Sequence, residues 1–202
     1  MVADGNIALK VIWIQGQFGP FTSPCSAQGR EINVVQNAKV WCTQSGCNCN
    51  WIYYKKHNDG DYWNYFDKNN LDEWPCYDSA VFVRWQFGSG IYHHGKSRNK
   101  PIPIKYCKPG KLVFLTSRES GKPESDRKII GCFSIAGITT HPDWGNVIHA
   151  GAIRLRASDF DHAPLYWAHH KQNGGPRWGT GLFRYIPDSE AQTMLNALVV
   201  VC

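Results

Sequence analysis

Leu112-Val113-Phe114-Leu115-Thr116 and Lys128-Ile129-Ile130-Gly131-Cys132-Phe133-Ser134-Ile135 are the clearest strand candidates in this chain. Their β-branched and aromatic side chains are typical of β-strands. The polar residues 117–127 between them predict a loop, so we expect the two runs to pair as a long-looped antiparallel hairpin. This hairpin is the centre of the predicted fold.

Further strands are expected at 8–14, 80–87 and 147–155, because each run is rich in apolar β-formers. Glycines within or beside these runs suit bulges or tight bends in a strongly curved sheet or small barrel; they are Gly131, Gly137 and Gly151. The chain closes with a predicted helix, in which Ser189 and Gln192 form a capping-box signature. Its apolar face consists of Ala191, Met194, Leu195, Leu198 and Val199. The pattern predicts an α+β fold.

Positive charge is concentrated in one part of the chain. The 202 residues include 22 Lys or Arg and 16 Asp or Glu, a net charge of +6. Residues 96–128 contain ten of those bases and only three of the acids. Such clustering is typical of surfaces that bind nucleic acid or another polyanion, and a solvated face of a soluble domain is the alternative.

The loop that follows the predicted strand at 80–87 combines glycine, an aromatic ring, two histidines and three bases, in Gly90-Ile91-Tyr92-His93-His94-Gly95-Lys96-Ser97-Arg98-Asn99-Lys100. Cationic side chains and backbone amides on a loop are the usual phosphate ligands. The predicted nucleic-acid-binding residues of this loop are Tyr92, His93, Lys96, Arg98 and Lys100. A polar surface loop without a ligand is the alternative.

Aromatic side chains are abundant, with nine each of Trp, Tyr and Phe, and they supply candidate stacking platforms. Trp85, Tyr92 and Trp178 each lie next to a glycine-rich loop at the end of a predicted strand, and Arg177 precedes Trp178. We expect these residues to line a base pocket, with Trp13 and Trp63 as second choices. Core filling by Trp178 is the alternative.

Catalysis is the weaker prediction. His93-His94 leaves open a metal-dependent nuclease or hydrolase, although no Asn-His pair follows at the interval of an HNH site. A second Asp/His-rich stretch favours a surface turn over a metal site; it contains Asp159, Asp161, His162, His169 and His170. An aromatic cage for a methylated lysine is a further alternative.

Three cysteines fall within eight residues at Cys42, Cys47 and Cys49, and Cys25 lies upstream. Four thiolates satisfy tetrahedral Zn²⁺, so these cysteines predict a structural zinc site. Cys76, His57 or another histidine could replace Cys25 as a ligand, and buried unliganded thiols or disulfides are the alternatives to a zinc site. Cys107, Cys132 and Cys202 lie in or near apolar runs and are expected to pack without a ligand.

Lys108-Pro109-Gly110-Lys111-Leu112-Val113-Phe114-Leu115, followed after a polar loop by Arg127-Lys128-Ile129-Ile130-Gly131-Cys132-Phe133-Ser134-Ile135, resembles the central hairpin of PUA-like domains of the EVE, ASCH, YTH and SRA branches. Leu182-Phe183-Arg184-Tyr185-Ile186 before the last helix is similar to the closing pattern of EVE domains. The resemblance covers about residues 105–200. The Cys-rich segment is not part of the usual pattern.

This resemblance implies a strongly bent PUA-like β-barrel with flanking helices and a C-terminal helix. It also implies nucleic-acid binding, with a single modified base of DNA held in an aromatic pocket, because several branches do this. Extracting a base costs a few kcal/mol, which stacking and edge hydrogen bonds offset. Such modules are often fused to nuclease domains in modification-dependent restriction systems, so a fused or associated nuclease is an expected partner.

We expect a single PUA-like domain over 1–202, in which 15–76 forms a Cys/aromatic-rich insertion or a small Cys-rich N-terminal zinc subdomain. The first residues lack the basic and apolar regions of a signal peptide, which favours a reducing compartment. The expected location is the cytoplasm or nucleoid of a bacterium or the nucleus of a eukaryote. No apolar run is long enough to cross a bilayer, so no membrane partner is expected.

Overall fold

The computed structural model describes residues 5–11, 81, 85–92, 95–119, 121–142, 144–170, 175–179 and 181–202. The chain divides into two compact units, one formed by residues 1–13 with 85–202 and the other by residues 14–84. The elements of the first unit, in chain order, are β1 (Asn6–Lys10), β2 (Gln86–Gly88), the 3₁₀ turn η2 (Gly95–Ser97), β3 (Leu112–Ser117), the 3₁₀ turn η3 (Glu124–Asp126), β4 (Lys128–His141), β5 (Gly145–Arg156), α5 (Tyr166–His169), β6 (Phe183–Ile186) and α6 (Asp188–Val199).

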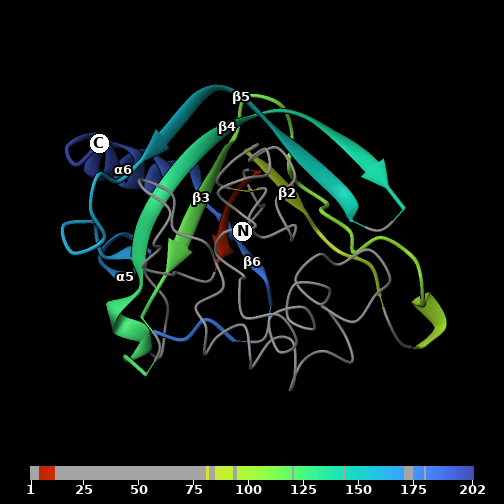
Figure 1. Ribbon diagram of the computed structural model, residues 1–202, viewed down its shortest axis with the longest axis horizontal. Helices are drawn as coiled ribbons and strands as arrows, with labels where there is room; N and C mark the ends of the chain where they lie inside the picture. Colours follow the sequence, from red (N-terminus) through yellow and green to blue (C-terminus); the bar gives the residue numbers. More distant parts are fainter. Residues whose placement is uncertain are drawn as a thin grey trace, which may run out of the picture. The chain divides into compact units, whose positions relative to one another are not determined.

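The first unit is a mixed α+β structure built on one strongly curled, half-barrel sheet (Figure 1). Its six strands lie in the order β2-β5-β4-β3-β1-β6. Strands β3 and β4 form the predicted antiparallel hairpin, with Leu112 opposite Ser134 and Ser117 opposite Lys128. Strand β1 pairs in parallel with β3 and antiparallel with β6, so the N-terminal strand joins two distant parts of the chain.

Register shifts along β4 and β5 show where the sheet bends. Phe133 lies opposite Arg154 and Ile135 opposite Ala150, so β5 contains two extra residues at this point. Gly137 then lies opposite His149, which gives β4 one extra residue. Bulges of this kind bend a strand and increase its twist. The predicted strong curvature is therefore confirmed, with Gly137 beside one of the two shifts.

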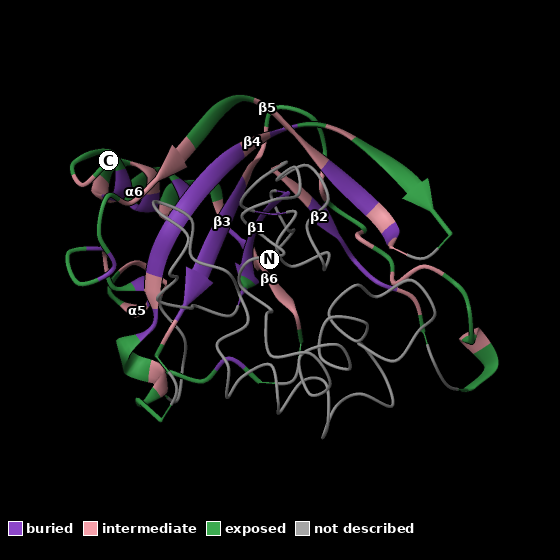
Figure 2. Cartoon of the chain, in the orientation of Figure 1, coloured by how far each residue is buried: buried purple, intermediate pink, exposed green. Residues whose placement is uncertain are grey.

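Both faces of the central strands are buried, as the purple ribbons of Figure 2 show. Ile7, Leu9 and Phe133 on one face are 0% exposed, and so are Ala8 and Phe114 on the other. On the second face the strands pack with α5 and α6 in a cluster that includes Tyr166, Trp178, Ile186, Ala191, Met194 and Leu198. Burial on this scale supplies most of the stability of such a sheet.

The last helix is present as predicted, but its N-terminus differs. The helix α6 begins at Asp188, one residue before Ser189, and Pro187 occupies the N-cap position without a side-chain cap. The predicted capping box of Ser189 and Gln192 is therefore wrong. Instead, Asn6 Nδ2 donates to Asp188 Oδ1 at 2.6 Å, and Lys111 Nζ lies 2.7 Å from the same oxygen.

Residues 101–106 join the two edges of the curled sheet. The Ile102 amide donates to the Gly90 carbonyl at 2.9 Å, just beyond the edge strand β2. The Lys105 amide donates to Tyr185 Oη at 3.0 Å, on the opposite edge strand β6. An extended chain rises at most about 3.6 Å per residue, so these two anchors lie within about 11 Å along the chain. This segment therefore links both edges of the half-barrel and carries part of the basic stretch.

Candidate nucleic-acid interface

The ten bases of residues 96–128 fall into two groups. Four are held by other residues: Lys111 by Asp188, Arg118 and Arg127 by Glu124, and Lys128 by the Phe160 and Asp161 carbonyls. The other six are exposed, and none of their side chains makes a hydrogen bond or ion pair with a described residue; they are Lys96, Arg98, Lys100, Lys105, Lys108 and Lys122. Five of these six lie between residues 96 and 108, which we call the basic stretch.

The first part of the basic stretch is a closed loop. Ile91 and Pro101 form an isolated antiparallel bridge, and the Tyr92 amide donates to the Lys100 carbonyl at 2.9 Å. Tyr92 is 38% exposed. The structure thus places four predicted site residues on one loop: Tyr92, Lys96, Arg98 and Lys100. His93 and His94 lie outside the described residues.

A network of buried polar contacts holds the base of this loop against the β4–β5 turn. Ser89 is 0% exposed; its hydroxyl donates to the Ile102 carbonyl at 2.7 Å and accepts from the Asn146 amide at 3.0 Å. Gly145 has a φ of +69°, and a Cβ there would lie 2.0 Å from the Gly90 carbonyl oxygen. Because the base is fixed, less conformational entropy is lost when the loop binds a partner.

Trp85 sits in an unusual backbone conformation, with a φ of 53°. Positive φ is rare for a bulky side chain and costs on the order of 1–3 kcal/mol. The indole lies edge-on to Phe133, with ring centres 6.2 Å apart, and the Arg156 guanidinium carbon lies 5.9 Å from the ring centre. Burial lowers the pKa of Arg156. Trp85 therefore contacts both the sheet core, through Phe133, and the half-buried Arg156. Among the described residues, no contact links Trp85 to Tyr92.

Trp178 is part of the core. It is 4% exposed, its Nε1 donates to the Gly181 carbonyl at 2.7 Å, and its ring packs 5.3 Å from that of Tyr166. The Arg127 guanidinium carbon lies 4.7 Å from the same ring. Trp178 therefore fills the core, as the alternative reading of the sequence expects, and it is not part of the proposed binding surface. Arg177, next to it, is exposed.

Sequence reasoning missed an exposed aromatic group at the second part of the basic stretch. Tyr106 is 47% exposed, and its ring centre lies 4.9 Å from that of Tyr185. Phe183, two residues before Tyr185 on β6, lies 5.7 Å from the Tyr185 ring. The bases on either side of Tyr106, Lys105 and Lys108, are the signal in the sequence that points to this site.

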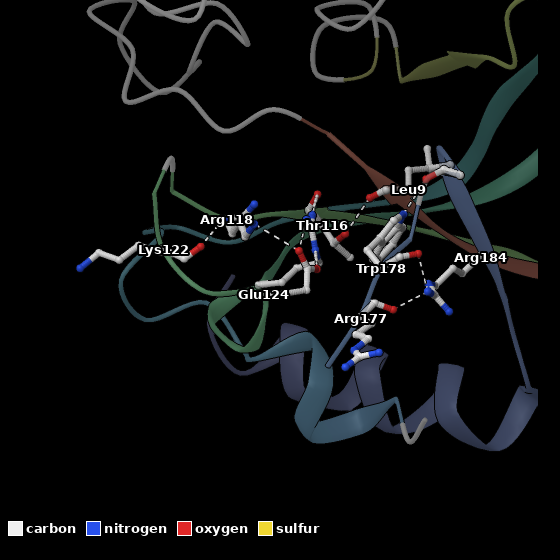
Figure 3. Close-up of polar contacts among 10 residues, drawn as sticks. Leu9, Thr116, Arg118, Lys122, Glu124, Arg177, Trp178 and Arg184 are labelled. Carbon is white, nitrogen blue, oxygen red and sulfur yellow. Dashed lines mark hydrogen bonds and ion pairs between the residues drawn. The ribbon is translucent and has the colours of Figure 1, made fainter. Parts of the chain in front are cut away.

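Arg118, Glu124 and Arg127 form a charge cluster at the loop that joins β3 to β4 (Figure 3). Arg127 is 1% exposed on its side chain, and both its Nε and its Nη2 donate to the Glu124 carboxylate, Nη2 at 3.1 Å. Arg118 Nε donates to the same carboxylate at 3.1 Å. Burial opposes ionisation of Glu124, but hydrogen bonding and charge from Arg127, with the charge of Arg118, outweigh it and lower its pKa. This cluster fixes the hairpin loop.

The predicted zinc ligands Cys25, Cys42, Cys47 and Cys49 lie outside the described residues, so that site stays a prediction. Within the described ranges, no group of three or more His, Cys, Asp or Glu side chains could hold a metal ion. His162 pairs with Asp159 at 2.7 Å, and His170 pairs with Glu190 at 2.6 Å.

The described cysteines are free thiols, and two of them are poorly ionised. Burial raises the pKa of Cys107 to about 12. Cys132, which is 0% exposed, has its pKa raised by burial and by the nearby Cys202. Since the thiolate is the nucleophile and the metal ligand, Cys107 and Cys132 are suited to neither role.

Comparison of the chain with protein-family models, with curated proteins and with solved structures finds no match. Among the described residues, no helix is long and apolar enough to cross a membrane. The function is therefore inferred from the geometry of the basic stretch and its neighbouring aromatic rings.

Proposed function

We propose that this chain is a non-catalytic nucleic-acid-binding module that uses the basic stretch 96–108 as its phosphate-binding surface. The observation that carries the proposal is the set of five exposed basic side chains that make no hydrogen bond or ion pair with a described residue. A basic side chain that is already in an ion pair gains little by binding a phosphate. An exposed, unpaired one can bind a phosphate and release the counterions condensed on the nucleic acid. The loop that carries three of them is fixed at its base, as a positioning element should be.

The finer part of the proposal is that the module reads a modified base in DNA and belongs to the PUA-like class. The curled sheet and the closing helix support this assignment. Tyr92 and Tyr106 are exposed rings next to the Lys and Arg side chains of the basic stretch. They supply apolar contact for a nucleobase and for a methyl group on it.

Fluorescence-polarisation titrations with matched modified and unmodified DNA oligonucleotides test both parts. We expect binding at low salt, a preference for one modification, and clear weakening by the triple substitution Lys96→Ala, Arg98→Ala, Lys100→Ala. Lys122→Ala is the control, because Lys122 is also exposed but lies outside the basic stretch. Absence of binding to every oligonucleotide at low salt would end the proposal.

The same preparation separates the rival functions. Metal-dependent cleavage of the oligonucleotide that is lost in His93→Ala and His94→Ala would identify a nuclease. Binding of a methyl-lysine peptide together with indifference to nucleic acid would identify a peptide-binding module. Neither result is expected from an exposed, unpaired basic surface.

We also propose one structural zinc ion per chain, bound by Cys25, Cys42, Cys47 and Cys49. The support is the donor set itself, since four closely spaced thiolates match the needs of Zn²⁺. Metal analysis of the purified protein is expected to find about one zinc per chain, by the four-ligand stoichiometry of such sites, and Cys47→Ser is expected to lower it. Fully folded protein without metal would dismiss the site.

A further inference from the structure

Tyr106 lies in an irregular segment outside the strands and is exposed, yet its surroundings hold its backbone in place. A Cβ on Gly5, which has a φ of +92°, would lie 2.5 Å from the Tyr106 carbonyl oxygen, so the backbone here packs directly on the start of β1. The preceding amide, that of Lys105, donates to Tyr185 Oη at 3.0 Å. The Tyr106 ring is thus presented to solvent from a fixed backbone.

The rings next to Tyr106 are arranged edge to face. The planes of Tyr106 and Tyr185 are inclined at 77° with ring centres 4.9 Å apart, and those of Tyr185 and Phe183 at 79° with centres 5.7 Å apart. In this arrangement Tyr185 supports Tyr106 from one side. A ring held in this way loses little further freedom when a flat ligand stacks on it.

The charges around Tyr106 decide what kind of flat ligand fits. Lys105 and Lys108 are exposed and lack an ion-pair partner among the described residues. Lys100 lies five residues before Lys105. An extended chain places Lys100 within about 18 Å of Lys105, a span of several nucleotides of one strand. An aromatic face between unpaired cations is complementary to a base flanked by phosphates.

We propose that Tyr106, supported by Tyr185 and Phe183, is a stacking platform for an unpaired base, and that this makes the module selective for single-stranded nucleic acid. The inference rests on the proposed function and names its substrate class. In a duplex the base faces are already stacked, and only their edges and the phosphates are accessible. Lys105 and Lys108 bind the phosphates on either side of the stacked base.

The test compares binding of a fluorescein-labelled 15-nucleotide single strand with that of the matching duplex, across a range of salt concentrations. Stacking contributes roughly 1–3 kcal/mol per base, so Tyr106→Ala is expected to weaken single-strand binding about 5- to 150-fold. Duplex binding and the salt dependence should stay as in the wild type. Tyr106→Phe, which keeps the ring, should bind within about twofold of the wild type because stacking needs only the aromatic face.

A second readout detects stacking without relying on affinity. Irradiation of a single strand that contains 5-iodouracil is expected to cross-link the peptide that carries Tyr106, and Tyr106→Ala should lose this cross-link. Tyr106→Ala that binds the single strand as tightly as the wild type, or a wild type that prefers duplex, overturns the inference. If the Lys96/Arg98/Lys100 substitutions still weaken binding in that case, the proposed function holds and only the stacking inference fails. No binding of either oligonucleotide overturns both.

Discussion

Replacing Glu124 with glutamine removes the counterion of a buried arginine while nearly preserving side-chain shape. Arg127 is 1% exposed, Glu124 20% and Arg118 34%, and both arginines share the one carboxylate. In Glu124→Gln the guanidinium of Arg127 stays buried without a negative partner. We therefore predict a loss of stability well beyond that of an ordinary surface substitution.

The size of the loss follows from the burial of the two partners. Breaking a buried ion pair by removing one partner costs about 3–5 kcal/mol, and the partial exposure of Glu124 places this case near the lower value, about 3 kcal/mol. For a chain of this size, that loss corresponds to a fall in Tm of about 6–12 °C. Arg118→Ala breaks only the more exposed pair and should cost about 0–1 kcal/mol.

Thermal and urea denaturation followed by circular dichroism measure these differences. The double substitution Glu124→Gln, Arg127→Met removes the stranded charge as well, so it should be more stable than Glu124→Gln alone. Because the folded pKa of Glu124 is below its usual value of 4.5, its contribution is present above the unfolded pKa and lost as the pH falls through the folded pKa. The gap between wild type and Glu124→Gln should therefore shrink only below about pH 4.5. A Tm for Glu124→Gln within one degree of the wild type at pH 7 would refute the reasoning.

Three further predictions concern other parts of the unit. Gly145→Ala should destabilise the protein by about 2 kcal/mol or more in urea denaturation, because a positive φ and a clash with the Gly90 carbonyl combine. Gly137→Ala is the control: a Cβ there meets nothing within 4 Å, so stability should change by less than about 1 kcal/mol. Equal effects of the two substitutions would contradict this reasoning. Trp178→Ala should lower stability by about 3–5 kcal/mol as a core truncation, and oligonucleotide affinity measured on the folded fraction should not change. In alkylation at pH 8 followed by peptide mass spectrometry, the exposed Cys202 should react well before the buried Cys132, and faster modification of Cys132 would show that β4 opens readily.

The longer elements could be predicted from the sequence because each carries its own pattern, whereas the strand predicted at 80–87 is wrong in extent: β2 covers only Gln86–Gly88 and Val81 is helical. The runs that form β3, β4 and β5 are long and rich in β-formers, and α6 shows a clear apolar face. The parallel pairing of β1 with β3 could not be predicted, because it joins residues more than 100 positions apart and leaves no local signal. The added length of β4, from Ala136 to His141, is mostly exposed and ends in two threonines and a histidine, so the buried apolar run ends before the strand does.

The candidate site could be predicted in outline but not in detail. A charge count identifies the basic segment but does not show which bases are paired, and Arg127 is a buried structural residue. Trp178 and Trp85 are predicted site residues because they lie beside glycine-rich loops, a criterion that core aromatics also meet. Tyr106 was missed because residues 101–108 follow no helical or strand period.

The salt dependence of oligonucleotide binding tests the central claim most directly. For the wild type, the logarithm of the association constant should fall linearly with the logarithm of salt concentration, by about 0.7 to 0.9 for each phosphate contacted. The Lys96/Arg98/Lys100 triple substitution should reduce that slope by about 2 to 3, one contact for each base removed, while Lys122→Ala should leave it unchanged. A slope that is near zero, or that is the same in the triple variant and the wild type, would contradict the assignment of residues 96–108 as the phosphate-binding surface.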